Sequence, residues 1–211
     1  MTLPALEQWD DTRQGLHQAA QIIGAIRRAV SSPEPNWMHL GLAAIPVGLT
    51  TGGTDVGEWI LNFAQGKIFY DTPAGAKHEL ALVGQTQQSL AIAVERTLQA
   101  AGFAGKLDHE KLAGNTELVV DLAQAADYAV ALHLIWAALN EFRENLAGYK
   151  TRLVVWGHGF DAAFLWFSSA TAVNEEKDPH MQYLRQKSGT RQTNTHFGVF
   201  DLRDWLSKTN M

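Results

Sequence analysis

A histidine and an aspartate, His158 and Asp161, interrupt an apolar stretch of the chain, VVWGHGFDAAFLWFS at residues 154–168. An aspartate beside a histidine can fix the tautomer of the imidazole and raise its basicity, which suits the ring to act as a general base. The same residues can instead form a turn, in which Asp161 caps the backbone around Gly157 and Gly159. The sequence leaves both interpretations open, a catalytic pair or a structural turn.

A Trp-x-His pattern occurs twice, at Trp37 with His39 and at Trp156 with His158. Each copy follows a predicted helix and a break, and each opens an apolar strand, which hints at an internal duplication. A duplicated fold would bring the two histidines into related positions near the centre of one sheet. His39 also has a structural interpretation, in which its ring nitrogens bond to backbone groups at a strand end.

A polar stripe lies on a predicted helix near the N-terminus. His17, Gln21 and Arg28, with Gly24 between them, fall on one side of this helix, opposite its apolar face. The stripe is either a solvated helix face or one wall of a ligand site.

Other kinds of chemistry find less support in the sequence. His17, His39, His158 and Asp161 have acceptable ligand chemistry for zinc or iron, but no closely spaced ligand pair anchors such a site. We therefore predict no metal site. The chain has no cysteine and no G-x-S-x-G motif, which excludes thiolate chemistry and disfavours a serine nucleophile. The sequence identifies no cofactor.

The elements that must position these residues are typical of an α+β protein. Helices are predicted at 10–32, with Asp10 or Asp11 as the N-cap, at 86–102 and at 122–146. The strands are predicted at 36–51, 57–64, 67–72, 77–83, 151–157 and 160–168, and a last short apolar piece lies at 196–200. We predict a single domain over residues 1–211, with an antiparallel or mixed sheet and about three main helices packed against it.

Two connections between these elements lack a periodic pattern. Residues 103–116 are predicted to be a loop, because the helical spacing of apolar residues is lost there. Residues 170–195 are polar, and they form either a mobile segment or a loop that folds over a site.

The bulk composition restricts the class of protein. The net charge of −5, without runs of like charge, argues against a nucleic-acid partner. The N-terminus lacks a signal-peptide pattern, and the longest apolar stretch, YAVALHLIWAAL, is too short to span a membrane. We expect a soluble cytoplasmic protein. Only 18% of the residues are charged, which leaves little charge to cover the surface and suggests a partner or a second copy.

The chain resembles a bacterial protein family, domain of unknown function 5996, over roughly residues 3–182. The segments that carry the resemblance are WDDTRQGLHQAAQIIGAIR, NWMHLGLAAIPVGLTT, FRENLAGYKTRLVVWGHGFDAAFLWFS and DPHMQ. The family's motif positions fall on Leu16, His17, Gln21, Gly24, Arg27, Trp37, His39, Trp156, His158, Phe160 and Asp161.

This resemblance implies a single soluble α+β protein and brings no activity, substrate or cofactor. The chain departs from the family at two places. A lysine common after the motif glycine is replaced by Ala25, so chemistry that required this lysine would be lost here. The tail after DPHMQ also lacks the aromatic and glycine-rich ending typical of the family, which puts a lid formed by the tail in doubt.

Two hypotheses from different classes follow. The leading one is a small-molecule binding protein or enzyme with a polar pocket at the centre of the sheet. In it, the predicted catalytic residues are His158 and Asp161, and the predicted ligand-binding residues are His17, Gln21, Arg27, His39, Trp37 and Trp156. The alternative is a non-catalytic structural or interaction module, a homodimer whose histidines are structural.

Overall fold

The computed structural model describes residues 3–167 and 194–200. Residues 170–195 were predicted to be either a mobile segment or a loop over a site; of these, 170–193 lie outside the described part of the chain, and the last two belong to β8. The helices are α1 (Asp10–Val30), the 3-10 helix η1 (Pro35–Leu40), α2 (Gln87–Ala100) and α3 (Leu122–Asn145). The strands are β1 (Gly41–Ile45), β2 (Gly48–Thr50), β3 (Glu58–Asn62), β4 (Lys67–Asp71), β5 (Lys77–Ala81), β6 (Val154–Trp156), β7 (Asp161–Phe167) and β8 (Asn194–Phe200).

The strands form one sheet in the order β5-β4-β3-β2-β1-β6-β7-β8, and every neighbouring pair is antiparallel. The predicted α+β class is therefore confirmed, and the sheet is antiparallel. Strand β1 lies inside the sheet because β6, from the C-terminal half of the chain, pairs with its free side. The register places Gly41 opposite Trp156.

The helix boundaries follow from their caps. Thr86 and Ser89 form a reciprocal capping box at the start of α2, and the Asp121 carboxylate caps α3. Both caps agree with the sequence prediction. The prediction for α1 is wrong by one residue, because Trp9 is the N-cap. Asp10 and Asp11 lie in the first turn instead, where their negative charges face the positive end of the helix dipole.

The predicted strand at 36–51 is divided into three elements. Its first part is η1, in which Asn36 and Trp37 have left-handed backbone angles, φ 55° and φ 57°. The remainder forms the tight β1–β2 hairpin, which closes on the pair Ile45 and Gly48. The apolar pattern of residues 36–51 therefore predicted that this segment is largely buried, but it did not predict the 3-10 helix or the hairpin.

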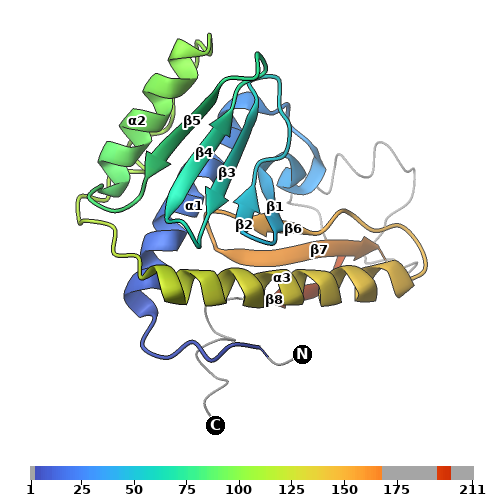
Figure 1. Cartoon of the computed structure of the whole chain (residues 1–211). Helices are drawn as coiled ribbons and strands as arrows, with labels where there is room; N and C mark the ends of the chain where they lie inside the picture. Colours follow the sequence, from blue (N-terminus) through green and yellow to red (C-terminus); the bar gives the residue numbers. More distant parts are fainter. Residues whose placement is uncertain (1–2, 168–193, 201–211) are drawn as a thin grey trace.

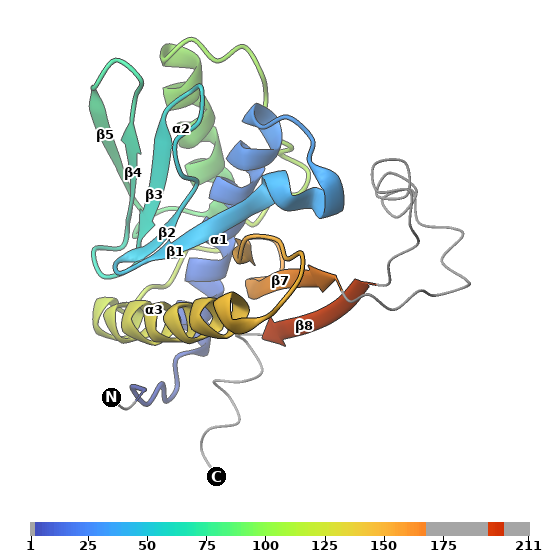
Figure 2. The same cartoon turned by 90° about the vertical axis from the view of Figure 1, so that its right-hand side faces the viewer.

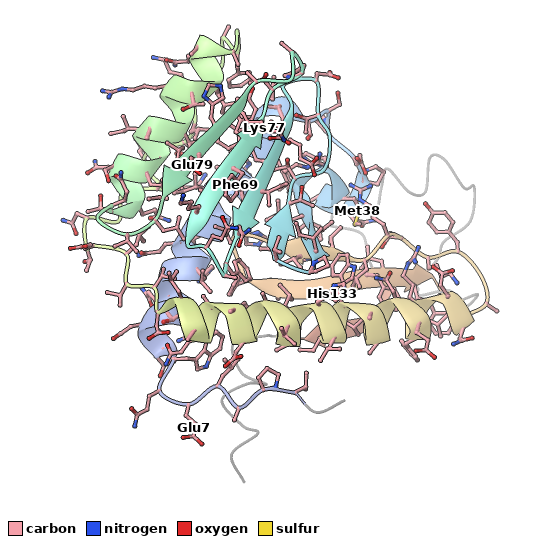
Figure 3. All side chains as sticks on the ribbon, in the orientation of Figure 1. Glu7, Met38, Phe69, Lys77, Glu79 and His133 are labelled. Atoms are coloured by element: carbon pink, nitrogen blue, oxygen red, sulfur yellow. The ribbon has the colours of Figure 1, made fainter. Side chains whose placement is uncertain are left out.

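The helices cover the sheet unevenly. Figures 1 and 2 show α1 and α2 on the same face of strands β3–β5. Phe69, Lys77 and Glu79 lie on the opposite face of β4 and β5, which no helix covers in the view of Figure 3. Strands β3–β5 run upright in Figure 1 whereas β7 runs across it, as expected for a strongly twisted sheet.

Helix α3 packs against β1, β2 and α1, and in Figure 1 it runs alongside β7. No charged residue occurs between Asp127 and Glu141, and Val130 and Phe142 are about half exposed. By length and composition α3 could cross a bilayer, a weak criterion that core helices of other proteins also meet.

An aromatic cluster joins the two halves of the sheet. Tyr128 of α3 packs between Phe63, which follows β3, and Phe160, which lies in the β6–β7 turn, with centroid distances of 5.4 Å and 5.5 Å. All three side chains are fully buried. The β6–β7 turn is therefore anchored in the core through Phe160.

The structure does not show the internal duplication suggested by the Trp-x-His repeats. The first repeat lies in η1, directly before β1. The second spans the last residue of β6 and the turn that follows it. Because β1 and β6 are antiparallel neighbours, the two repeats still meet at the same end of the sheet.

Candidate functional site

Helix α1 and the β6–β7 turn approach each other closely at two glycines. A Cβ added to Gly157 would lie 2.5 Å from the carbonyl oxygen of Ala20. A Cβ added to Gly24 would lie 3.5 Å from the Cα of Gly157, an ordinary contact. The absent side chain of Gly157 lets the turn pack on the helix backbone, which brings the motif residues of α1 beside those of the turn.

His17 fastens this turn to α1 through the turn's backbone. Its Nε2 lies 3.0 Å from the carbonyl oxygen of His158. A carbonyl oxygen only accepts hydrogen bonds, so Nε2 carries the proton and donates it. The His17 ring also stacks on Phe160, with a centroid distance of 5.4 Å and an interplanar angle of 15°. Phe160 has a left-handed φ of 57°, so these contacts hold a conformation that a phenylalanine rarely adopts.

Gln21, one turn further along α1, is oriented by the buried side chain of Gln87. The Gln87 amide oxygen accepts a hydrogen bond from the Gly114 N–H, and its amide nitrogen donates to the Gln18 carbonyl and, at 2.7 Å, to Gln21 Oε1. The Gln21 nitrogen then faces His17 Nε2 at 3.4 Å. Because the His17 proton already points to a carbonyl, the Gln21 amide keeps its own hydrogens for another acceptor.

His39 is buried in η1, and its ring bonds to the backbone. Its Nδ1 accepts a hydrogen bond from the Glu34 N–H at 3.1 Å, which leaves the proton on Nε2. Burial lowers the pKa of His39, and the charges of Arg27 and Arg28 lower it further, whereas Glu34 opposes the shift. The ring packs 5.8 Å from that of Trp37.

Arg27 lies in a charged cluster beneath η1. Arg152 donates two hydrogen bonds to the Glu34 carboxylate, at 2.8 Å and 3.3 Å, and another to the Met38 carbonyl. The hydrogen bond from Arg152 is the main reason that the pKa of Glu34 is lowered. Burial, followed by repulsion from Arg152, lowers the pKa of Arg27. Arg152 thus ties η1 and the residue before it to the segment that leads into β6.

A cavity of about 820 Å³ lies where α1, η1, the loop before α3 and the β6–β7 hairpin meet. This volume is typical of small-molecule sites. The residues that line it are Gln21, Gly24, Ala25, Arg28, Asn36, Trp37, Met38, Leu40, Asp108, Lys111, Leu112, Trp156, Gly157, His158, Asp161, Ala163, Phe164 and Leu165. Met38 can be located in Figure 3.

The loop at 103–116 contributes one wall of the cavity because Glu95 of α2 holds it. The Glu95 carboxylate accepts a hydrogen bond from the Leu107 N–H at 2.9 Å, and it contacts His109 Nε2 at 2.6 Å. The Leu107 N–H is the main reason that the pKa of Glu95 is lowered. The residue between these two anchors, Asp108, faces the cavity and binds Lys111 at 2.6 Å.

The polar groups of the β6–β7 turn have different surroundings. His158 is exposed, and its imidazole makes no hydrogen bond within residues 3–167. The Asp161 carboxylate lies over Gly159, with Oδ1 2.1 Å from the position that a Cβ would take there. The two side chains are not hydrogen-bonded to each other.

The structure thus divides the predicted site residues into two sets. Five of them line the cavity: Gln21, Trp37, Trp156, His158 and Asp161. The other three do not line it: His17 bonds to the β6–β7 turn, His39 accepts a hydrogen bond from the backbone beside η1, and Arg27 lies near the charges of Glu34 and Arg152. Sequence reasoning missed Gln87, Asp108 and Lys111, since long-range hydrogen bonds such as those of Gln87 and Glu95, and no local pattern, bring the loop to the cavity.

In the described part of the chain, no three His, Asp or Glu side chains gather closely enough to hold a metal ion. The four ligands considered from the sequence therefore do not form a cluster there.

Comparison with known proteins gives a family and nothing finer. No curated protein and no solved structure matches the chain. One family model, described as a family of unknown function (DUF5996), matches residues 2–201. The match covers both motif segments and the whole of the sheet. The chain belongs to the family of unknown function DUF5996.

Proposed function

We propose that the protein binds a small molecule in the cavity between α1, η1 and the β6–β7 hairpin. The observation that carries this proposal is the lining of the cavity. Five residues predicted as site residues, from three separate segments, lie around one space of about 820 Å³. Binding sites for small molecules have this size and this mixture of an apolar wall with a few polar groups.

The backbone around the cavity supports the same proposal. Asn36, Trp37 and Phe160 account for three of the four non-glycine residues with positive φ in the described part of the chain. Two of them line the cavity, and Phe160 lies in the turn that also supplies His158. Such conformations cost about 1–3 kcal/mol each and concentrate at functional sites.

A ligand in this cavity would lie beside the His158 imidazole and the Asp161 carboxylate. These are therefore the two groups that we propose for proton transfer, should the bound molecule react. Binding is the property to test first, because it is common to a binding protein and an enzyme.

The test is fluorine NMR of protein in which the seven tryptophans carry a 5-fluoro label. The Trp37 and Trp156 resonances are assigned by Trp→Phe substitution, and a library of neutral and charged fragments is added. We expect binding fragments to shift these two resonances and to leave that of Trp59, which is fully buried in the core, unchanged.

The variant Ala25→Leu fills part of the cavity and should weaken binding at least tenfold. The matched control is Ala100→Leu, on an exposed position of α2. The proposal fails if no fragment shifts the Trp37 and Trp156 resonances, or if Ala25→Leu and Ala100→Leu bind fragments equally well.

A further inference from the structure

We infer that the ligand of this cavity is an organic anion with a planar ring. The inference rests on the proposed binding function and names the chemical class of the ligand. It follows from the hydrogen-bond donors, the acceptors and the apolar groups that the cavity offers.

The cavity presents donors that have no protein acceptor among residues 3–167. Arg28 lines it, is exposed, and forms no hydrogen bond or ion pair within residues 3–167. The Gln21 amide nitrogen also lines it, and the orientation set by Gln87 leaves its hydrogens available. The exposed His158 imidazole is the third donor. A ligand that satisfies these groups must carry acceptors, and the arginine favours a negative one.

The two carboxylates among the lining residues are already engaged. The Asp108 carboxylate binds the Lys111 ammonium at 2.6 Å, and Arg28 adds a further positive charge near it. The Asp161 carboxylate is folded back over Gly159. A cationic ligand would have to displace these contacts to reach a carboxylate, whereas an anion can bind the donors of the cavity and leave these contacts intact.

The remaining wall is apolar and rich in rings. Trp37, Trp156 and Phe164 line the cavity together with Met38 and Leu112. The Trp37 side chain is 46% exposed, and its backbone has a left-handed conformation in η1. Indole rings gain most from a flat partner in an offset or edge-on stack. A planar ring therefore fits this wall better than a saturated one.

Four probes of one size separate these properties: 2-naphthoate, 2-naphthyl phosphate, 2-naphthamide and decahydro-2-naphthoate. Their affinities are measured by calorimetry, and their position is read from the fluorotryptophan resonances. We expect at least one of the two aromatic anions to bind ten times more tightly than the neutral amide and the saturated acid. The naphthoate and the naphthyl phosphate together distinguish a carboxylate from a phosphate ligand.

Variants locate the two contributions. Arg28→Gln should weaken binding of the tighter aromatic anion about tenfold and leave naphthamide unchanged. Its control, Arg96→Gln, removes an exposed arginine of α2 and should change neither affinity. Trp37→Leu should weaken binding of the tighter aromatic anion and of naphthamide. Melting curves verify that this variant is folded.

If naphthamide and both aromatic anions bind with equal affinity, the ligand is not an anion. If decahydro-2-naphthoate binds as tightly as the aromatic anions, the ligand does not need a planar ring. In both cases binding in the cavity would persist, so the proposed function would survive. If none of the four probes binds while neutral fragments of another shape still shift the Trp37 resonance, the inferred ligand class is overturned and the proposed function again survives.

Discussion

At the scale of single residues, the two motif histidines that meet at the turn have different roles. His17 donates to the backbone carbonyl of His158 and stacks on Phe160, so it supports the turn. The His158 side chain makes no hydrogen bond within residues 3–167; its ring contacts that of Trp156 at a centroid distance of 6.3 Å, and the residue lines the cavity. The sequence predicted both residues, but it could not show that they meet through a carbonyl.

This difference predicts unequal effects on stability. His17→Ala removes the donor to the His158 carbonyl and the ring that covers Phe160, and should lower the free energy of unfolding by about 1–3 kcal/mol. His158→Ala should change it by less than about 0.5 kcal/mol, because the side chain is exposed. Urea denaturation of both variants checks this. A larger loss in His158→Ala than in His17→Ala would contradict the assigned roles.

At the scale of elements, the sequence was sufficient to predict a helix boundary where a capping residue determines it. The ends of α2 and α3 were predictable from Thr86 and Asp121, which bond to their own helices. The division of residues 36–51 was not predictable. Two consecutive left-handed residues in η1 are maintained by tertiary contacts, such as the bond from Arg152 to the Met38 carbonyl.

The contact between α1 and the turn predicts opposite effects for two glycine substitutions. Gly24→Ala adds a methyl at an ordinary contact distance and should stabilise the helix by up to about 1 kcal/mol. Gly157→Ala forces a methyl against the Ala20 carbonyl and should destabilise the protein by about 1–3 kcal/mol.

Thermal melting of the two alanine variants, with the parent protein as reference, provides the comparison. Equal melting temperatures for Gly24→Ala and Gly157→Ala would show that the turn does not depend on this close approach.

At the scale of the whole molecule, the pattern of predicted helices and strands indicated the fold class, and the sequence motifs predicted five of the 18 residues that line the cavity. Asp108 and Lys111 could not be predicted, because the loop that bears them has no periodic pattern and is positioned by Glu95. Arg27 and His39 were predicted near the site, but burial turned them toward neighbouring backbone and charged groups.

The middle of α3, which carries no charged residue between Asp127 and Glu141, leads us to propose a homodimer. Val130 and Phe142 are 49% and 46% exposed, and the chain has little charge to cover such a surface. A second copy offers the same apolar surface, so the two can pair about a twofold axis. We expect sedimentation velocity to show a dimer at micromolar concentration and Val130→Lys to dissociate it.

The control for this experiment is Val119→Lys, which places the same charge on an exposed residue outside α3. A monomeric parent protein would reject the dimer, and so would a dimer that Val130→Lys leaves intact.

The pairing of β1 with β6 also affects how the protein folds. The partners Gly41 and Trp156 are more than a hundred residues apart, so this ladder must close a long loop after the β1–β5 meander has formed. During synthesis, β1 stays an open edge strand, able to pair with other chains, until β6 leaves the ribosome. The cavity, which needs the β6–β7 turn beside η1 and α1, can therefore form only once this long-range pairing is made.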